Sequence, residues 1–388
     1  MKNKFVVSII SLMGVGMIVK VLGFFRSLLI ARQFGSGATT DAFFLALSLI
    51  GIFTSFFGGA LGQTIVPILT EITYSEGQEA KDRHMSNIVN LFIVGSIAII
   101  GFIWLLAPQI INLMAKDGFT ASQVNLTVDL LRIGLPALLF YNITGLYKGY
   151  LHTEEIFVIS EISNLPYNII YILYLLALSS LFGIRGLMFA HGIAVFSMLI
   201  LPIHTIKKRG YHHSLIFKPR DPYIIKSLNM ILPVFMGIAI NDLNIFIDQL
   251  MASRLAVGSI SALNYGNRFN IIVQQIFVAA LSTVIFPEIS KAYQEKDHKS
   301  VTNIVQRGMN LVLLVVIPMT IAIMVLHVPV TRLLFERGEF TPLATQMTAK
   351  AMFFYSLGLP AASLKVLLLK LSYASMDMKL PLVNSILS

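Results

Sequence analysis

Long uncharged apolar runs recur along this chain and constrain its fold more than any other feature. A helix needs about 20 apolar residues to cross the hydrocarbon core of a bilayer. Five runs meet this length without a charge: Ala42–Thr70, Ile88–Ala115, Ile162–Ile184, Gly186–Ile206 and Gly308–Thr331. Five more qualify if one or two internal charges are accepted: Phe5–Leu29, Asp129–Lys148, Ser227–Met251, Ser261–Pro287 and Thr345–Leu369. We therefore expect an all-α polytopic membrane protein with about ten complete transmembrane helices.

Composition supports the membrane assignment. Hydrophobic residues make up 56% of the 388 residues and charged residues 12%, whereas soluble domains carry about 25% charged residues. No small-residue cleavage site follows the first apolar run, so we expect it to be retained as the first helix. The absence of cysteine excludes disulfides, thiolate metal sites and a cysteine nucleophile. In a chain this apolar, the net charge of +10 indicates membrane topology and anionic lipid rather than nucleic-acid binding.

Loop charges predict the orientation and the division into lobes. With the N-terminus inside, fourteen Lys and Arg residues fall in inner segments and six in outer ones, which favours a cytoplasmic N-terminus. We expect an N-terminal lobe of six helices over residues 1–206 and a basic cytoplasmic linker over 207–222. A C-terminal lobe follows over 223–388. Its eleventh helix begins near Pro381 and stops at Ser388, so the chain is expected to be a fragment of a longer protein.

An internal repeat supports two related lobes around a central cavity. Ala60–Pro67 aligns with Ala280–Pro287 with four identities in eight residues, and Ile30-Ala31 with Gly37 aligns with Met251-Ala252 and Gly258. Six helices separate the copies, so both enter the membrane from the same side. Parallel repeats of this kind build transporters whose substrate site lies between the lobes. Chance similarity between two apolar helices is the alternative.

Charged side chains inside the expected spans are the candidate functional residues. Lys20 and Arg26 lie in the first helix, Asp41 opens the second and Arg268 lies in the eighth. A charge in hydrocarbon costs several kcal/mol, so it survives where it faces a wet cavity or a partner. Arg26 could instead snorkel to the membrane surface, Asp41 or Thr40 could be a helix N-cap, and Arg268 could form a structural ion pair. Asp41 is also a candidate counter-ion for Arg26.

The seventh expected helix carries a polar stripe. Asn241, Asn244 and Asp248 share one face, and Asp242 is adjacent. Carboxylate and amide oxygens suit Na⁺ or a proton, so Asp242, Asn244 and Asp248 form a candidate cation site. Polar packing between helices explains such a stripe equally well.

Enzyme signatures are missing from the sequence. The eight histidines show no HExxH spacing, and neither a P-loop nor a G-x-S-x-G motif occurs. We expect a transporter without catalytic residues, cofactor or structural metal.

Several segments in chain order resemble the MurJ (MviN-type) lipid II flippase family. They are Val21–Arg26, Ala31–Gly35, Thr40–Phe44, Val66–Leu69, Leu263–Arg268, Phe286–Ser290 and Leu334–Thr341. The resemblance implies a fourteen-helix transporter of the multidrug/oligosaccharidyl-lipid/polysaccharide exporter superfamily. It would move the undecaprenyl-pyrophosphate-linked peptidoglycan precursor from the inner to the outer leaflet, in the bacterial inner membrane and beside the cell-wall synthesis machinery.

The resemblance also implies a cavity lined by basic residues of helices one, two and eight. Arg26, Asp41 and Arg268 match the family by position. Lys20 stands where an arginine is usual, and Thr54 stands where the family has a further arginine. In some relatives a helix-seven aspartate binds a cation, and here that residue would be Asp242 or Asp248.

We therefore expect two lobes that rock about a central cavity in which Arg26, Arg268 and Lys20 hold the pyrophosphate. An ion gradient (Na⁺ or H⁺) or the membrane potential would bias the cycle. The alternatives are a flippase for another polyprenyl-linked saccharide, a drug exporter, a membrane-embedded transferase and a non-transporting scaffold.

Overall fold

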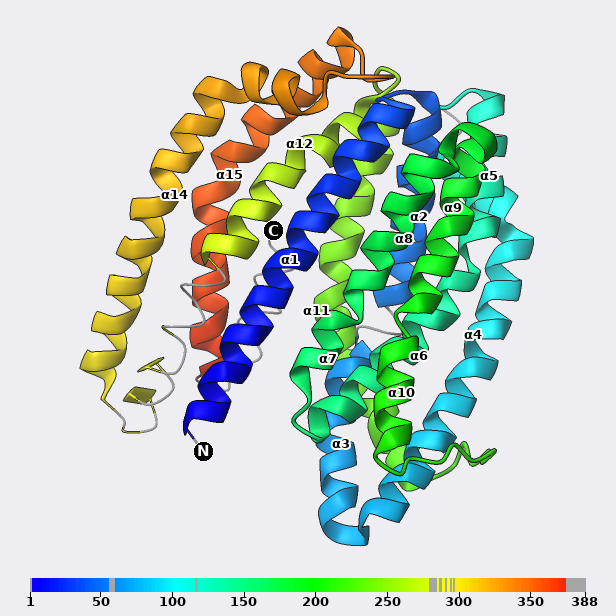
Figure 1. The fold of residues 1–388 in the computed structure, drawn as a ribbon, viewed down its shortest axis with the longest axis vertical. Coiled ribbons are helices and arrows are strands. Elements are labelled where there is room, and N and C mark those ends of the chain that lie inside the picture. Colours follow the sequence, from blue (N-terminus) through cyan, green and yellow to red (C-terminus); the bar gives the residue numbers. More distant parts are fainter. Residues whose placement is uncertain are drawn as a thin grey trace. The chain divides into compact units, whose positions relative to one another are not determined.

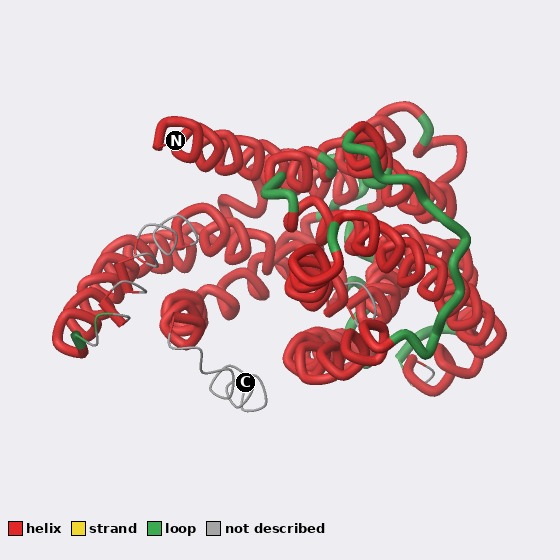
Figure 2. The backbone as a smooth tube through the Cα atoms, turned by 90° about the horizontal axis from the view of Figure 1, so that it is seen from below, coloured by secondary structure: helices red, strands yellow, loops and turns green. Residues whose placement is uncertain are grey.

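The computed structural model describes residues 2–55, 60–115, 118–278, 285, 288–289, 292–293, 295 and 297–374. Within these ranges the chain forms helices joined by loops and contains no strand (Figures 1 and 2). The predicted all-α class is therefore confirmed.

The helices follow one another in the order labelled in Figure 1. Their bounds are α1 Lys2–Phe34, α2 Ala38–Thr54, α3 Ala60–Glu76, α4 Gln78–Ala115, α5 Ala121–Gly134, α6 Pro136–Thr153, α7 Phe157–Ile162, α8 Asn164–Ala177, α9 Ser179–Ser197, α10 Ile200–Lys208, α11 Pro222–Ser253, α12 Ser259–Val273, the π-helical η2 Gln274–Val278, α14 His298–Phe335 and α15 Pro342–Ala374.

Six helical stretches of the described chain are long and apolar enough to cross a membrane. They are Gly14–Phe34, Gln78–Ala115, Ala121–Thr153, Ser179–Lys208, Lys299–Phe335 and Pro342–Leu368. The predicted span 42–70 is divided between α2 and α3, and α2 alone is a shorter apolar helix of 17 residues. The predicted helix start near Pro381 lies outside the described residues. So does most of the second copy of the predicted repeat, residues 280–287.

Local sequence sets several of the helix ends. Thr120 and Gln123 form a capping box at the start of α5, in which each side chain bonds the other residue's backbone N–H. Asp221 accepts a hydrogen bond from the backbone nitrogen of Tyr223, and Pro222 follows it as the first residue of α11. The N-terminus of α11 is therefore encoded by three consecutive residues.

Contacts divide the chain into two compact units. The first contains Met1–Gln33 and Ala38–Ala256, and the second contains Phe34–Gly37 and Val257–Ser388. In the first unit α11 packs against α3 and α2, although the predicted C-terminal lobe begins at residue 223. The boundary between the two compact units therefore lies after α11, whereas the predicted boundary between the two lobes lies before α11. The lobe boundaries remain a prediction.

The core of the first unit is a cluster of aliphatic and tyrosine side chains from α3, α4, α6 and the segment before α11. Tyr150 and Tyr211 lie in it with Leu146, Met85 and Ile65. Burying each large apolar side chain contributes about 1.5–3 kcal/mol where water is the alternative. Ile206 of α10 and Ile224 of α11 belong to the same cluster, so it joins five helices of the unit.

Large apolar side chains also cover the outside of both units. Leu105, Val325 and Phe354 keep 67%, 69% and 68% of their surface exposed. A soluble monomer rarely exposes so much apolar surface, and lipid is the solvent that suits it. The exposed apolar surface therefore agrees with the membrane assignment.

In the second unit, α15 packs against α14 and α12, and the turn that joins α1 to α2 contacts the start of α12. Ser36 donates a hydrogen bond to the carbonyl oxygen of Gly258 at 2.9 Å, and Tyr265 donates one to that of Gly35 at 3.2 Å. Gly35 and Gly258 have φ of 66° and 96°, a conformation that glycine adopts without strain. These contacts join two turns that the repeat alignment places in equivalent positions.

Candidate functional site

Arg26 is the predicted site residue whose surroundings are best defined. It lies in α1, is half-buried, and its guanidinium carbon is 4.8 Å and 4.9 Å from the ring centres of Tyr167 and Tyr171. Both tyrosines come from α8, where a spacing of four residues puts them on one face. Two ring faces within about 6 Å of a guanidinium attract it through their quadrupoles. We call Arg26, Tyr141, Tyr167, Tyr171 and His191 the aromatic cage.

His191 of α9 fixes the two tyrosines. Its Nδ1 lies 2.9 Å from the Tyr171 hydroxyl and 3.3 Å from the Tyr167 hydroxyl. The imidazole is buried, and the Tyr141 ring of α6 lies 6.1 Å away, centre to centre. Three helices thus contribute to the surroundings of one arginine of α1.

The aromatic cage leaves hydrogen-bonding groups of Arg26 and His191 unused. Arg26 Nη1 and His191 Nε2 are buried, and neither has a hydrogen-bond partner among the described residues. Aromatic faces hold a guanidinium without accepting its in-plane N–H bonds, so the aromatic cage positions the cation without neutralising its charge. Anion binding by Arg26 stays a prediction.

Two polar contacts dock α1 onto α8 on either side of Arg26. Asn168 donates a hydrogen bond to the Val19 carbonyl oxygen at 3.3 Å, and Gln33 donates one to that of Leu175 at 3.2 Å. These bonds tie backbone groups to side chains where water is scarce. They fix the position of Arg26 along the α1 axis relative to the two tyrosines of α8.

The other predicted residues of the basic cavity occupy separate elements. Lys20 is half-buried on α1, and Asp41 is buried in the first turn of α2. Because α2 begins at Ala38, Thr40 and Asp41 lie inside the helix, so the predicted N-cap role is wrong for both. An acidic residue in the first turn still interacts favourably with the helix dipole. The pairing of Asp41 with Arg26 stays a prediction.

Arg268 lies on α12 in the second unit and is half-buried. Its convergence with Arg26 on one substrate stays a prediction, as does its pairing with Asp242 or Asp248. Thr54, which stands at the position of a family arginine, bonds through its hydroxyl to the Ile50 carbonyl oxygen at 2.8 Å. Its hydroxyl proton is therefore used within α2.

The residues of the predicted cation site lie on α11 and differ in burial. Asp242 is half-buried on α11, and its Oδ2 has no hydrogen-bond partner among the described residues, whereas Asp248 is exposed. Asn244 is half-buried, and the side chain of Asn241 lies outside the described part. Within that part, no cluster of three His, Asp or Glu residues has metal-binding geometry. Ion binding by Asp242, Asn244 and Asp248 remains a prediction.

Sequence reasoning missed the other four members of the aromatic cage. Tyrosines are common in apolar helices, so their presence does not indicate a site. The spacing of four residues between Tyr167 and Tyr171 is the one feature of the sequence that places two of them on the same helix face. The approach of α1 to α8 joins residues about 140 positions apart in the chain, and only tertiary structure reveals it.

Comparison with known proteins identifies the family. A family described as "Lipid II flippase MurJ" matches residues 30–388. The probable lipid II flippase MurJ of Rickettsia prowazekii (strain Madrid E) is 31% identical over 378 residues, which cover 96% of this chain and 73% of that protein. The chain belongs to the lipid II flippase MurJ family. The predicted resemblance is confirmed.

Solved structures agree with this assignment. A lipid II flippase MurJ in an inward closed conformation matches with a TM-score of 0.82 at 25% identity, covering 96% of this chain and 78% of that one. An inward-facing MATE family transporter of the MOP superfamily matches with a TM-score of 0.69 at 14% identity, covering 97% and 87%, and shares the fold alone. MurJ proteins are transporters rather than enzymes. With its several apolar helices, this chain is a multi-pass inner-membrane protein.

Proposed function

We propose that this chain moves lipid II, a lipid-linked saccharide pyrophosphate, from the inner to the outer leaflet for peptidoglycan synthesis. The observation that carries the proposal is the MurJ family match over residues 30–388. The structure supplies two features that such a substrate needs. Apolar side chains cover the outside for the lipid tail, and a cation inside a membrane-spanning helix is available for the pyrophosphate.

Arg26 is the residue we assign to the pyrophosphate. The aromatic cage holds its guanidinium plane, and the N–H bonds in that plane match the oxygens of a phosphate group in pairs. A hydrogen bond to a charged group is worth about 1.5–3 kcal/mol. A few such bonds offset part of the cost of moving a headgroup through hydrocarbon, yet they are weak enough to release it.

Lys20, Arg268 and Asp41 complete the proposed substrate site. Lys20 and Arg268 would add positive charge along the path, and Asp41 would set the position of one of these cations. Rocking of the two lobes would then expose the site to each leaflet in turn. An ion gradient acting through Asp242, or the membrane potential acting on the cations, would bias the cycle.

The alternative cargo is another polyprenyl-linked saccharide. Lys20 offers a point charge where the family usually has the bidentate fork of an arginine, and Thr54 offers no charge at all. Both differences weaken recognition of a pyrophosphate relative to the family pattern. Comparing lipid II with a polyprenyl-linked capsule unit in one flipping assay separates the two cargoes.

Orientation and partners follow from the same proposal. Positive charge is concentrated in the segments that lie inside when the N-terminus is cytoplasmic. Delivery of a peptidoglycan precursor to the outer leaflet would place the protein beside the cell-wall synthesis machinery.

The test is lipid II flipping in proteoliposomes, paired with complementation of a flippase-depleted strain. We expect Arg26→Gln and Arg268→Gln to abolish flipping. Arg26→Lys should retain part of it, because the charge stays while the fork is lost. Arg185→Gln is the matched control, since Arg185 is 61% exposed and its ion pair with Asp129 lies outside the aromatic cage. Full rescue by both the Arg26→Gln and Arg268→Gln variants would reject the pyrophosphate role.

A further inference from the structure

The segment between α10 and α11 is fixed to α4 rather than free. We call residues 209–221 the strap. Asn87 donates a hydrogen bond to the Lys218 carbonyl oxygen at 3.0 Å and accepts one from the Lys218 backbone nitrogen at 2.8 Å. One turn further along α4, Asn90 donates to the carbonyl oxygens of Ser214 and Ile216 at 2.9 Å and 3.0 Å. The basic segment predicted as a linker is therefore an ordered element.

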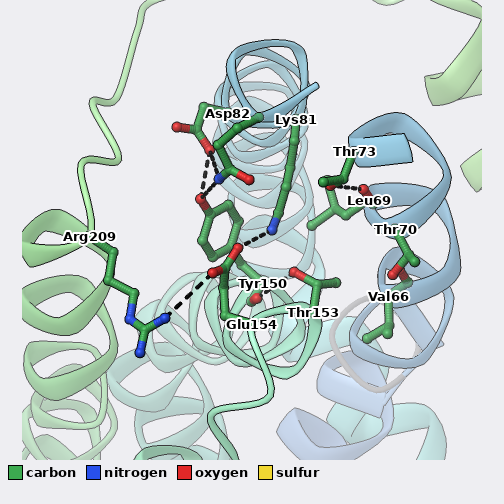
Figure 3. A network of polar contacts seen from close by, with 11 residues as sticks. Val66, Leu69, Thr70, Thr73, Lys81, Asp82, Tyr150, Thr153, Glu154 and Arg209 are labelled. Atoms are coloured by element: carbon green, nitrogen blue, oxygen red, sulfur yellow. Dashed lines mark hydrogen bonds and ion pairs between the residues drawn. The ribbon is translucent and has the colours of Figure 1, made fainter. Parts of the chain in front are cut away.

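A buried polar network anchors the beginning of the strap. Arg209 lies 3.6 Å from the Glu154 carboxylate, which also pairs with the buried ammonium of Lys81 (Figure 3). The Tyr150 ring lies 4.4 Å from that ammonium, and its hydroxyl donates to Asp82 at 2.6 Å. The strap is held at its start by charge and further along by amide hydrogen bonds.

A cavity of about 300 Å³ opens beneath the end of the strap. We call it the strap cavity. Its walls come from α3, α4, the strap and the first turn of α11, and its polar lining includes Glu76, Arg83, His84, Lys218, Asp221 and Tyr223. Because Asn87 fixes both backbone groups of Lys218, the place of that residue in the wall is built into the fold.

Several nitrogen atoms that line the strap cavity form no hydrogen bond with another described residue. His84 is buried, and neither ring nitrogen has a hydrogen-bond partner among the described residues. Its Nδ1 lies 3.8 Å from Asp221, too far for a hydrogen bond. The Lys218 ammonium forms no hydrogen bond or ion pair in the described part of the chain. Arg83 forms an ion pair with Glu79 at 3.7 Å, on the solvent-exposed side of α4.

Each acidic group of the wall accepts a hydrogen bond from Tyr223 and keeps its negative charge. Glu76 accepts a hydrogen bond from the Tyr223 hydroxyl at 2.8 Å, and Asp221 accepts one from the Tyr223 backbone nitrogen at 2.9 Å. The unused capacity of the cavity therefore belongs to an ammonium, a guanidinium and a buried imidazole. Groups of these types bind oxyanions, and above all phosphate.

The cavity lies where phosphate groups are abundant. The 38 residues of α4 make a helix of about 57 Å at 1.5 Å per residue, against a hydrocarbon thickness of about 30 Å. Its charged first turns, Gln78–Asn87, therefore project beyond the apolar segment that begins at Ile88. That depth is the zone of lipid headgroups and of the aqueous phase beside them.

We propose that the strap cavity binds a phosphate group through Lys218, Arg83 and His84. The phosphate is supplied by an anionic lipid headgroup or by a soluble phosphate. The site is separate from the aromatic cage and does not depend on the cargo of the transporter. An occupied site joins α4, the strap and the start of α11, so binding stabilises the first unit.

Two binding measurements on the purified full chain test the proposal and identify the source of the phosphate. In detergent, inorganic phosphate is titrated against chloride at equal ionic strength while thermal unfolding is followed. In nanodiscs, retention of phosphatidylglycerol over phosphatidylcholine is measured by native mass spectrometry. We expect the wild-type chain to respond in at least one measurement, and we expect Lys218→Gln to weaken that response about tenfold or more.

The controls keep the result interpretable. Arg220→Gln makes the same charge change in the same strap but does not alter the cavity wall, and it should bind like the wild type. His84→Gln should weaken binding, and in the wild type the His84 imidazole pKa, followed by NMR, should rise when phosphate binds. Absence of binding in both measurements, or equal loss in Lys218→Gln and Arg220→Gln, would overturn the proposal.

Discussion

The aromatic cage makes a quantitative prediction about Tyr167. Replacing Tyr167 with leucine removes one of the two ring faces that lie 4.8 Å and 4.9 Å from the Arg26 guanidinium. A cation–π contact is worth about 0.5–1 kcal/mol when exposed and about 2 kcal/mol when desolvated. Because Arg26 is half-buried with a buried Nη1, we expect the loss to lie between about 1 and 2 kcal/mol. A tenfold effect corresponds to about 1.4 kcal/mol, so flipping should slow by roughly 5- to 30-fold.

Tyr167→Phe is the matched control for this prediction. It keeps the ring face but removes the hydroxyl that lies 3.3 Å from His191 Nδ1. That contact is long for a hydrogen bond involving a hydroxyl, so we expect less than about a threefold loss of flipping. Tyr167 is only half-buried, and thermal unfolding of both variants checks that the fold is intact.

The assay is the initial rate of lipid II translocation in proteoliposomes over a range of substrate densities. If the rings position Arg26 for the pyrophosphate, the leucine variant should be defective while the phenylalanine variant stays near wild type. Equal activity of the two variants, in correctly folded protein, would show that the ring face does not position the guanidinium.

Three further predictions concern stability. Lys81→Met alone should destabilise the first unit by about 1–3 kcal/mol, because the Glu154 carboxylate loses its buried partner and keeps Arg209 at 3.6 Å. Adding Glu154→Gln should restore part of the thermal stability. Burial lowers the pKa of His84, and the negative charges of Asp221 and Glu76 oppose part of this shift. The folded state therefore binds a proton at His84 less readily than the unfolded state, whose pKa is about 6.5. We expect the protein to be most stable above that pH and to lose stability as the pH falls below it. Thermal unfolding at pH 7.5 and 5.5 should therefore differ less in His84→Gln than in wild type. Gly35→Ala should lower the free energy of unfolding by about 1–3 kcal/mol, because residue 35 has a φ of 66° and a Cβ there would lie 2.3 Å from the Glu339 carbonyl oxygen. Gly37→Ala is the control, because a Cβ at residue 37 meets nothing within 4 Å. Chemical denaturation should show almost no change for Gly37→Ala.

Hydropathy predicts most of the described helices because a helix in lipid must be apolar over a fixed length. The same property hides breaks within a run. α8 ends at Ala177 and α9 begins at Ser179 inside one continuous apolar stretch, 162–184. Breaks of this kind depend on packing between helices, which hydropathy does not report.

The contacts of the strap could not be predicted from the sequence for a related reason. Its basic, proline-containing sequence is typical of an exposed connection. What fixes it is Asn87 and Asn90, two amides one turn apart on α4 whose partners are backbone groups about 125–130 residues away. Every residue has a backbone carbonyl oxygen, so the sequence of the strap does not show which of its residues bind Asn87 and Asn90.

For Arg26 the sequence predicts a role in substrate binding and a carboxylate counter-ion, and both stay predictions. The cost of a charge in hydrocarbon suggested a counter-ion, and Asp41 was the nearest candidate. The structure adds partners of another kind, the neutral rings of Tyr167 and Tyr171. A carboxylate would occupy the N–H bonds of the guanidinium and cancel its charge, whereas ring faces stabilise the cation and leave both its charge and its in-plane donors for a ligand. If Arg26 binds the pyrophosphate as proposed, ring partners suit both binding and release, because they do not compete with the substrate for the guanidinium N–H bonds as an acidic side chain would.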